Sequence, residues 1–319
     1  MTRFQPHGLL PVYKPPGLVS KDVSRQLERT FGRLKLGHVG TLDPMAEGVL
    51  PLLLGAATRL QDHLLASRKC YRVEMTFGYE TDTLDAEGNI LRELPIPQYT
   101  REQIEAEIAG FLGAQTQSPP IYSAIKYKGR PLYDYARKGE MDKVPLAELK
   151  RSIQVYSFSF QSWDGQRLIA ELEVSKGTYI RSVVRDLAEK LGCCATMTRL
   201  IRNQAAGLFA EQCHPLHTIL ELSPDNFRQA VIPIEDMALP MPSCRLGGAT
   251  VTRLQTGQKV WLGEAAFGES LRESGENWHC GPGSSPILLT DPSGRAFGLG
   301  LAQRSDHGKI WLNMKRGFR

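Results

Sequence analysis

Residues 38–59 read HVGTLDPMAEGVLPLLLGAATR, a glycine-containing turn followed at once by an apolar run. Gly40 and Pro44 indicate a turn, because glycine adopts φ values that other residues avoid and proline presets the backbone after Asp43. The turn carries a single carboxylate, Asp43, on a stiff support. An aspartate before a proline also begins many helices and turns, with its side chain capping backbone N–H groups. From these residues alone, a presented carboxylate and a capping carboxylate are both open.

The apolar run after the turn predicts a buried strand. Val49 to Leu54 is too short and too uniformly apolar for an amphipathic helix, and a glycine bounds it on each side. Pro51 lies inside the run and removes one backbone donor, which indicates an edge strand or a bulge. Beyond the run, leucines at helical spacing predict a short helix within residues 57–65.

Length and charge set the broad class. The chain has 319 residues, which favours two domains and allows a sizeable core. Its formal net charge of +5 permits a polyanionic partner without identifying one. The first residues, MTRFQPHG, contain no apolar segment typical of a secretory signal, and no run approaches the ~20 apolar residues of a membrane span. We therefore expect a cytoplasmic protein without a membrane partner.

The cysteines and histidines show no pattern of chemistry. Six cysteines and seven histidines have neither the spacings of a zinc site nor the density of a secreted disulfide framework. We expect the thiols to be buried or idle. The sequence predicts no metal and no cofactor.

Periodicity predicts the elements outside the opening stretch. These are a strand after Gly8, helices over 20–30, 100–111 and 180–191, and paired strands over 152–160 and 168–175. Ser20 is the expected N-cap of the first helix, and Thr100 begins the second with capping-box spacing. Arg181 falls in the first turn of the third helix, opposite the apolar stripe, where an arginine is usually solvated.

The stretch GHVGTLDPMAEGVLPLLLGAATR resembles the catalytic signature of the TruB family of tRNA pseudouridine synthases. Further stretches resemble the same family in the same order, namely KPPGLVS at 14–20, KCY at 69–71, TDTLDAEG at 81–88 and GTYIR at 177–181. The aspartate of GTLDP is the nucleophile of that family, so the resemblance implies that Asp43 is catalytic. It implies structural roles for Lys14 and for the TDTLDAEG loop.

The resemblance also assigns the residues around Asp43. On pattern alone Tyr71 is a core aromatic on a strand, His38 is structural and Leu200 is a plain core residue. The resemblance implies that Tyr71 lies against the target base, that Arg181 pairs with the nucleophile and that Tyr179 lines the pocket. It further implies that Leu200 lies under the uracil ring and that His38 occupies the space the flipped base leaves.

Basic and aromatic residues alternate through residues 117–139, which read QSPPIYSAIKYKGRPLYDYARKG. Cations suit phosphates and rings suit unstacked bases, so the segment is typical of a mobile RNA-gripping loop, while a solvated hairpin is the alternative. The family has an insertion here, over about 117–150, that closes on the tRNA. The following VPLAELKR departs from the more basic family pattern and keeps only Arg151.

The C-terminal part differs in character from the rest. Short strands at close spacing from Cys244 onward, the first of them within CRLGGATV at 244–251, predict a small β-barrel. Leu254, Gly257, Gln258 and Val260 resemble the PUA-type domain of the family, and residues 262–286 are expected to form an expanded loop. The predicted fold class is therefore α+β. A pseudouridine synthase catalytic domain with a mixed, largely antiparallel sheet is expected over 1–240, and a PUA-like RNA-binding β-barrel domain over 241–319.

The implied function is isomerisation of uridine 55 in the T-loop of tRNA to pseudouridine, after the base has been flipped out. The T-arm of tRNA is the implied partner, and no obligate protein partner is inferred. Two alternatives stay open, a pseudouridine synthase acting on another RNA and a non-catalytic tRNA-binding or tRNA-folding module. A glycosidase is disfavoured, because that chemistry uses a pair of carboxylates and only Asp43 stands in a motif.

Overall fold

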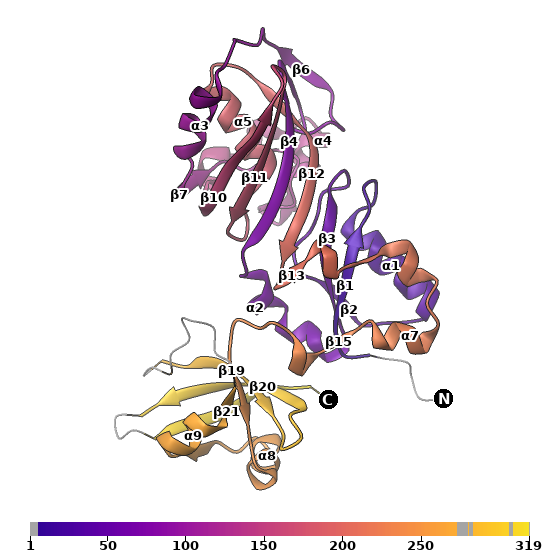
Figure 1. Ribbon diagram of the computed structural model, residues 1–319, viewed down its shortest axis with the longest axis vertical. Coiled ribbons are helices and arrows are strands. Elements are labelled where there is room, and N and C mark those ends of the chain that lie inside the picture. Colours follow the sequence, from indigo (N-terminus) through magenta and orange to yellow (C-terminus); the bar gives the residue numbers. More distant parts are fainter. Residues whose placement is uncertain (1–5, 273–279, 281–282, 306–308, 319) are drawn as a thin grey trace.

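Two β-sheets of unequal size organise the chain in the computed structural model, which describes residues 6–272, 280, 283–305 and 309–318 (Figure 1). The larger sheet has eleven strands, and the smaller sheet has six and lies at the C-terminal end. With helices packed on the larger sheet, the protein has the predicted α+β fold class.

The strands of the larger sheet and of its hairpins come from the first 233 residues. They are β1 (Gly8–Lys14), β2 (Leu36–His38), β3 (Glu47–Leu54), β4 (Lys69–Phe77), β5 (Tyr79–Thr81), β6 (Ile90–Glu93), β7 (Gly113–Gln117), β8 (Lys126–Tyr127), β9 (Arg130–Pro131), β10 (Arg151–Trp163), β11 (Arg167–Val174), β12 (Ala195–Ala205), β13 (Leu208–Phe209), β14 (His214–Pro215) and β15 (Ile232–Pro233). The smaller sheet contains β16 (Ser243–Arg245), β17 (Val260–Leu262), β18 (Leu271–Arg272), β19 (Ser285–Thr290), β20 (Ala296–Arg304) and β21 (Ile310–Gly317).

The helices are mostly short. They are α1 (Ser20–Phe31), α2 (Gln61–Leu65), α3 (Arg101–Ala109), α4 (Leu132–Arg137), α5 (Ile180–Lys190), α6 (Leu216–Leu220), α7 (Pro224–Gln229), α8 (Gly248–Gln255) and α9 (Glu264–Ser270). The predicted first, second and third helices correspond to α1, α3 and α5, and the capping box at Thr100 is present. None of the described helices is long and apolar enough to cross a membrane.

The predicted buried strand is β3, and it lies inside the sheet rather than at its edge. The order β14-β1-β3-β12-β4-β11-β10-β7 places β3 between β1 and β12. The expectation of an edge or a bulge at Pro51 was wrong, because the pairing register requires no N–H donor from this residue. Pro51 faces Pro11 of β1, while its own carbonyl accepts from Val39 on the other side. In an antiparallel pair, two opposite residues can form a non-hydrogen-bonded pair, in which neither residue donates an N–H to the other. Two prolines fit such a pair.

The large core lies between the sheet and the helices α1, α3 and α5. In α5, Val183, Val184 and Leu187 are fully buried at helical spacing, as the periodicity predicted. Met75 and Phe77 contribute the apolar face of β4, which alternates with partly exposed residues. The sheet and α5 thus carry their functional side chains on rigid elements.

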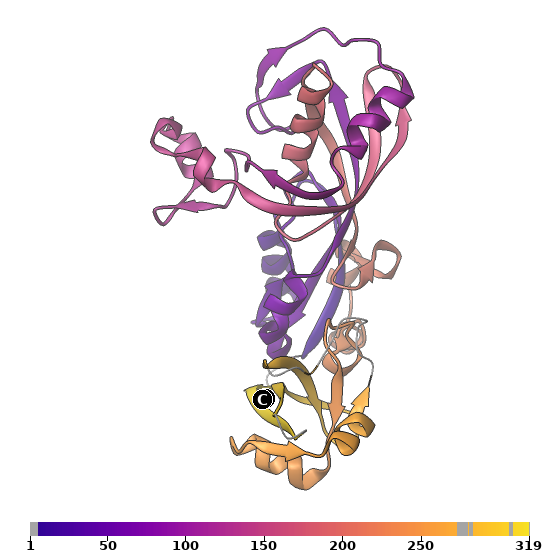
Figure 2. The same cartoon turned by 90° about the vertical axis from the view of Figure 1, so that its left-hand side faces the viewer.

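The insertion after β7 is a small folded unit rather than a bare loop. It contains the hairpin β8–β9 and helix α4, and it projects to the side of the larger sheet (Figure 2). Its own apolar cluster is built on Leu132, Tyr135 and Val144. The Arg130 guanidinium lies 3.5 Å from the centroid of the Tyr135 ring, so part of the basic and aromatic alternation serves this internal packing.

The smaller sheet has the order β17-β21-β20-β19-β16-β18 and a core of its own. Two local predictions in this part were wrong. The expected strand over 244–251 ends at Arg245 and helix α8 follows, because Val251 and Leu254 reach this core together at helical spacing. The expected loop over 262–286 contains helix α9, which buries Phe267, and residues 273–279 and 281–282 lie outside the described residues.

A second apolar cluster joins the two sheets. It contains Leu288, Leu299 and Phe318 from the C-terminal part together with Val49 and Leu53 of β3. The strand that follows the Asp43 turn and the smaller sheet therefore share one continuous apolar cluster.

Candidate active site

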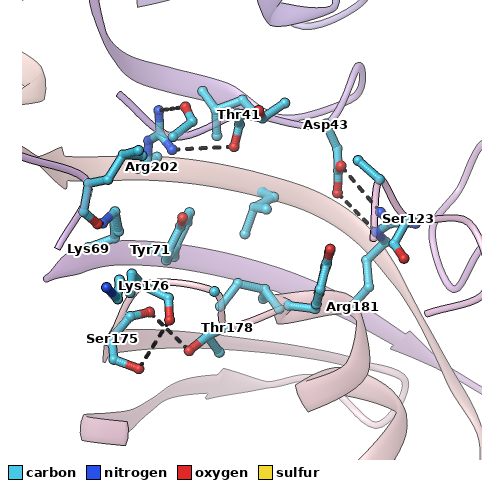
Figure 3. A pocket seen from close by; sticks show the side chains of 18 of the residues that line it. Thr41, Asp43, Lys69, Tyr71, Ser123, Ser175, Lys176, Thr178, Arg181 and Arg202 are labelled. Carbon is cyan, nitrogen blue, oxygen red and sulfur yellow. Dashed lines mark hydrogen bonds and ion pairs between the residues drawn. The ribbon is translucent and has the colours of Figure 1, made fainter. Parts of the chain in front are cut away.

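A cleft of about 1000 Å³ opens on the larger sheet and collects the motif residues from distant parts of the chain (Figure 3). Its walls come from the Asp43 turn, the starts of β4, β10 and α5, residues of the insertion that include Tyr122 and Tyr133, and β12. Asp43 and Arg181 lie at one end, and Lys69 and Lys176 lie at the other.

Asp43 projects from the predicted turn toward α5. Its carbonyl accepts from the N–H of Ala46, which closes the turn. The carboxylate keeps 32% of its side-chain surface exposed, so it is held by the protein yet open to the cleft. Its side chain accepts from the Arg181 guanidinium, and no backbone N–H of the described residues donates to it. This geometry supports the presented carboxylate over the capping one.

Arg181 faces Asp43 with two of its nitrogens. Nη2 donates to Oδ1 at 3.2 Å, and Nε lies 2.9 Å from Oδ2. Arg181 lies in the first turn of α5 as predicted, but the expectation that it points away from the buried side was wrong. Only 7% of its side-chain surface is exposed. The arginine is buried because other parts of the chain supply oxygen acceptors around it.

Those acceptors come from two other motifs. Nη1 donates to the carbonyl of Thr83 at 2.9 Å and lies 3.5 Å from the buried Asp85 carboxylate. Nη2 also donates to the carbonyl of Tyr122 at 3.2 Å. The TDTLDAEG loop, predicted to be structural, thus orients Arg181, and Asp85 balances its charge. A buried arginine needs such partners, because an unpaired buried charge is costly.

Ser20 clamps the peptide just before Asp43. The expected N-cap role was wrong, since Val19 occupies the cap position and Ser20 begins the helix with its side chain facing the turn. Its hydroxyl accepts from the N–H of Leu42 at 2.9 Å and donates to the carbonyl of Leu42 at 3.2 Å. Because Ser20 is buried in α1, the helix fixes the residue before Asp43.

Lys14 and Arg202 hold the same turn from either side. Lys14 is fully buried and donates to the carbonyl of Pro44 at 3.2 Å, and burial lowers its pKa from 10.5 to about 8 although Asp43 opposes the shift. Arg202 donates to the carbonyl of Gly40 at 3.0 Å and of Val49 at 2.7 Å. Gly40 has φ +79°, and a Cβ there would meet Arg202 at 3.2 Å.

Tyr71, Leu200 and Tyr179 line the cleft between its two ends. Tyr71 on β4 and Leu200 on β12 are buried, with 8% and 5% of their surface exposed. Tyr179 precedes α5, and the guanidinium of Arg151 lies 5.2 Å from its ring centroid. The three side chains give the cleft an apolar and aromatic wall near Asp43.

Positive charge gathers at the end of the cleft away from Asp43. Lys69 donates to the carbonyls of Leu65 and Ser67, and burial together with Arg202 lowers its pKa to about 8. Arg151 donates to the carbonyl of Gly177, while its buried Nε has no hydrogen-bond partner among the described residues.

Lys176 completes this basic end of the cleft. It is exposed, and no carboxylate within the described part of the chain forms an ion pair with it. Lys176 and Arg151 are thus cations that form no ion pair with a carboxylate of the described residues.

His38 is the one predicted site residue that does not line the cleft. It ends β2, and its Nε2 lies 3.3 Å from Oγ1 of Thr41 in the Asp43 turn. Burial and Arg202 lower its pKa. The ring therefore stands beside the turn, next to the cleft rather than within it.

Sequence reasoning missed Ser20, Asp85, Lys69 and Arg202 as parts of the site. A charged residue on the buried face of a strand was an available signal for Lys69 and Arg202, which share that face with Tyr71 and Leu200. Ser20 and Asp85 offered none beyond their motifs. The described residues contain no group of three or more His, Cys, Asp or Glu side chains placed to hold a metal ion.

The chain is similar to known proteins over most of its length. Residues 28–180 match the model of the TruB family pseudouridylate synthase, N-terminal domain. A tRNA pseudouridine synthase B from Serratia proteamaculans is 37% identical over 95% of this chain and 93% of its own. One from Caldanaerobacter subterraneus is 38% identical over 79% of this chain and 86% of its own.

Solved structures show the same fold. A Cbf5-Nop10-Gar1 complex contains a chain with a TM-score of 0.73 and 22% identity, covering 99% of this chain and 86% of that chain. An archaeal box H/ACA sRNP Nop10-Cbf5 complex gives a TM-score of 0.69 at 22% identity, over 99% of this chain and 87% of that one.

The matched family model and these relatives define the class of protein, a pseudouridine synthase, which is an isomerase. The relatives narrow this further, and the chain belongs to the TruB family of pseudouridylate synthases.

Proposed function

We propose that the protein converts uridine 55 in the T-loop of tRNA to pseudouridine, with Asp43 as the catalytic carboxylate. The observation that carries this proposal is the Asp43–Arg181 pair at one end of a cleft whose other end is basic. Family membership and relatives named tRNA pseudouridine synthase B support tRNA as the substrate.

The isomerisation requires few chemical groups besides a carboxylate that is held and exposed as Asp43 is. The bond from N1 to C1′ breaks, the base turns, and a bond from C5 to C1′ forms. The hydrogen on C5 leaves as a proton and N1 gains one, so the isomerisation balances without an oxidant or a reductant. Asp43 assists by covalent catalysis, for which an exposed and oriented carboxylate is suited. Arg181 orients it with two nitrogens in a fixed plane.

The wall of the cleft suits a flipped pyrimidine. A base taken out of its stack needs an apolar face to rest on, and an aromatic ring supplies one at ~1–3 kcal/mol per base. Tyr71 and Leu200 offer such faces beside Asp43, and Tyr179 borders them. His38 stands outside the cleft, where it is free to fill the space that the base leaves in the T-loop.

The basic end of the cleft suits the phosphates next to the flipped nucleotide. Lys176 and Arg151 are available there, because the described carboxylates leave them unneutralised. Removing one phosphate contact lowers the salt slope of binding by about 1. Lys176→Ala should therefore weaken binding of a T-arm stem-loop and make it less salt-dependent. An unchanged slope would exclude this contact.

The same proposal assigns the larger parts of the chain. Residues 1–240 form the catalytic domain, with the insertion over about 117–150 gripping the RNA, and residues 241–319 form a PUA-like RNA-binding domain. The enzyme acts on cytoplasmic tRNA.

Mapping pseudouridine in a defined tRNA tests the function. Purified protein is incubated with an unmodified tRNA transcript, with a transcript carrying cytidine at position 55, and with an RNA lacking a T-arm. We expect pseudouridine at position 55 of the first transcript alone. Modification of another uridine, or activity only on the RNA without a T-arm, would point to a synthase for another substrate. Tight binding of tRNA without any modification would indicate a non-catalytic module.

A further inference from the structure

Two tryptophans are exposed on the smaller sheet, where no catalytic motif lies. Trp261 on β17 keeps 51% of its surface exposed and Trp311 on β21 keeps 39%. An indole ring buried in a core removes a large apolar area from water. Two such rings left exposed on a rigid sheet therefore indicate a role other than core packing.

The two rings project from one face of the sheet. Trp261 pairs directly with Trp311 in the antiparallel register of β17 and β21. Directly opposite residues share a face, and their neighbours along each strand take the other face. Accordingly Val260, Ile310 and Leu312 enter the core of the smaller sheet. The tryptophans lie outside that core, which their apolar neighbours along each strand already fill.

Lysines surround the rings. The ammonium of Lys309 lies 4.9 Å from the ring centroid of Trp261. A neighbouring cleft of about 570 Å³ is lined by Trp311 together with Lys259 and Lys315. We call Trp261, Trp311, Lys259, Lys309 and Lys315 the tryptophan face.

The charge of this face is not cancelled locally. Arg304 borders the same cleft, but it pairs with Glu264. Within the described ranges, none of the three lysines forms an ion pair with a carboxylate. The face therefore combines flat rings with free positive charge.

We propose that the tryptophan face binds an unpaired stretch of the RNA substrate by stacking its bases on Trp261 and Trp311. Sequence-tolerant binding of single strands uses aromatic platforms beside cations that track the backbone. Bases inside a helix are already stacked and cannot reach such a ring, so the occupant is single-stranded. The occupant is a polyanion rather than an apolar protein surface, because lysines border the rings. This inference rests on the proposed function, which makes an RNA the substrate.

The bound stretch is distinct from the T-loop uridine. That base enters the cleft beside Asp43 on the larger sheet, whereas the tryptophan face belongs to the smaller sheet (Figure 1). The face therefore adds affinity for the substrate without taking part in the chemistry.

Binding of a short unstructured oligoribonucleotide to the full-length protein tests the proposal, with a blunt RNA duplex as the comparison. Loss of one stacked base weakens binding roughly 5- to 160-fold, which corresponds to ~1–3 kcal/mol. The variant Trp261→Ala/Trp311→Ala should lose oligoribonucleotide binding by at least that factor and bind full-length tRNA more weakly. Trp261→Phe/Trp311→Phe keeps flat rings and should retain most binding. Phe209→Ala, which removes a ring 50% exposed on the larger sheet, is the matched control and should change nothing.

The salt dependence separates stacking from charge. The tryptophan variants should keep the salt slope of oligoribonucleotide binding, while Lys259→Ala/Lys315→Ala should lower it by about 1 for each phosphate that no longer binds a lysine. Unchanged oligoribonucleotide binding in the double alanine variant would overturn the proposal, as would equal binding of the blunt duplex. If that variant does not fold, the lysine pair decides, and an unchanged slope there overturns the proposal.

Turnover on an isolated T-arm stem-loop keeps this inference apart from the proposed function. All tryptophan variants should convert the stem-loop like the wild type, since it carries no unpaired stretch outside its loop. A wild-type protein without turnover on the stem-loop or on tRNA would contradict the proposed function. Normal turnover with unaltered oligoribonucleotide binding would contradict only the tryptophan face.

Discussion

Replacing Arg181 by lysine probes how the site is held together. The guanidinium contacts the carboxylate of Asp43, the carbonyls of Thr83 and Tyr122, and the buried carboxylate of Asp85. A lysine keeps the charge but has a single nitrogen, so it cannot meet these acceptors together. Both hydrogen bonds to these carbonyls are partly buried.

The expected decrease in rate follows from those interactions. A hydrogen bond that involves a charged group contributes about 1.5–3 kcal/mol, and Arg181→Lys removes at least the two to Thr83 and Tyr122. Asp43 is then no longer fixed by a planar fork, and a shift of about 1 Å in a reacting group costs on the order of 100-fold in rate. We expect kcat/KM to fall roughly 100- to 1000-fold, which is about 3–4 kcal/mol of transition-state stabilisation.

The assay is release of tritium from C5-labelled uridine in a T-arm stem-loop under single-turnover conditions. Arg199→Lys is the matched control, because Arg199 also faces two carboxylates, Glu47 and Glu74, but is 53% exposed. An exposed pair contributes about 0–1 kcal/mol, so this control should be nearly silent. Wild-type turnover by a folded Arg181→Lys protein would show that the Arg181 guanidinium is not needed to hold Asp43 for catalysis.

Three further results are expected. Tyr71→Phe should keep base binding and Tyr71→Leu should lose it, measured as KM on the stem-loop; equal KM values would remove Tyr71 from the base-binding wall. Ser20→Ala should lower kcat more than it raises KM, because Leu42 loses its clamp, and Ser20→Thr should restore part of the rate; loss of thermal stability with unchanged kcat would leave Ser20 purely structural. Between pH 8 and 10.5 the unfolded chain binds a proton at Lys14 that the folded state has released, so the free energy of unfolding should rise with pH there. Chemical denaturation should show a smaller rise for Lys14→Met; an equal slope would mean that Lys14 titrates normally.

Local patterns predicted the elements that carry the site. The apolar run of β3 and the periodicity of α5 were sufficient, because both elements bury long stretches whose spacing is visible in the sequence. Pro51 led to a wrong prediction of an edge or a bulge, because a proline inside a strand lacks an N–H donor. Only the pairing with Pro11 shows that no donor is needed there. The helices α8 and α9 were missed because their segments are short and rich in glycine and small residues.

The partners within the site depend on tertiary contacts that no local pattern contains. Asp43 and Arg181 are 138 residues apart, so only the resemblance to a family could pair them from the sequence. The local pattern assigns the Ser20 hydroxyl to its own helix, whereas the fold directs it to Leu42. Asp85 belongs to a loop with a predicted structural role, and its second role, balancing Arg181, follows from burial.

The joined core of the two sheets also bears on how the smaller sheet is studied. Removing residues 241–319 would take Leu288, Leu299 and Phe318 out of the apolar cluster that also contains Val49 and Leu53 of β3. Such a truncation would expose the remaining residues of this cluster to water. Point variants of the tryptophan face therefore test RNA affinity better than a truncation does, because they leave this apolar cluster in place.

The most direct test of the central claim is the Asp43→Asn variant. Asparagine has nearly the same shape as aspartate but no charge, so the turn and the cleft are preserved while the carboxylate is removed. We expect this variant to bind a T-arm stem-loop with near wild-type affinity and to release no tritium from C5-labelled uridine. Release at the wild-type rate by a folded Asp43→Asn protein would contradict the assignment of Asp43 as the catalytic group.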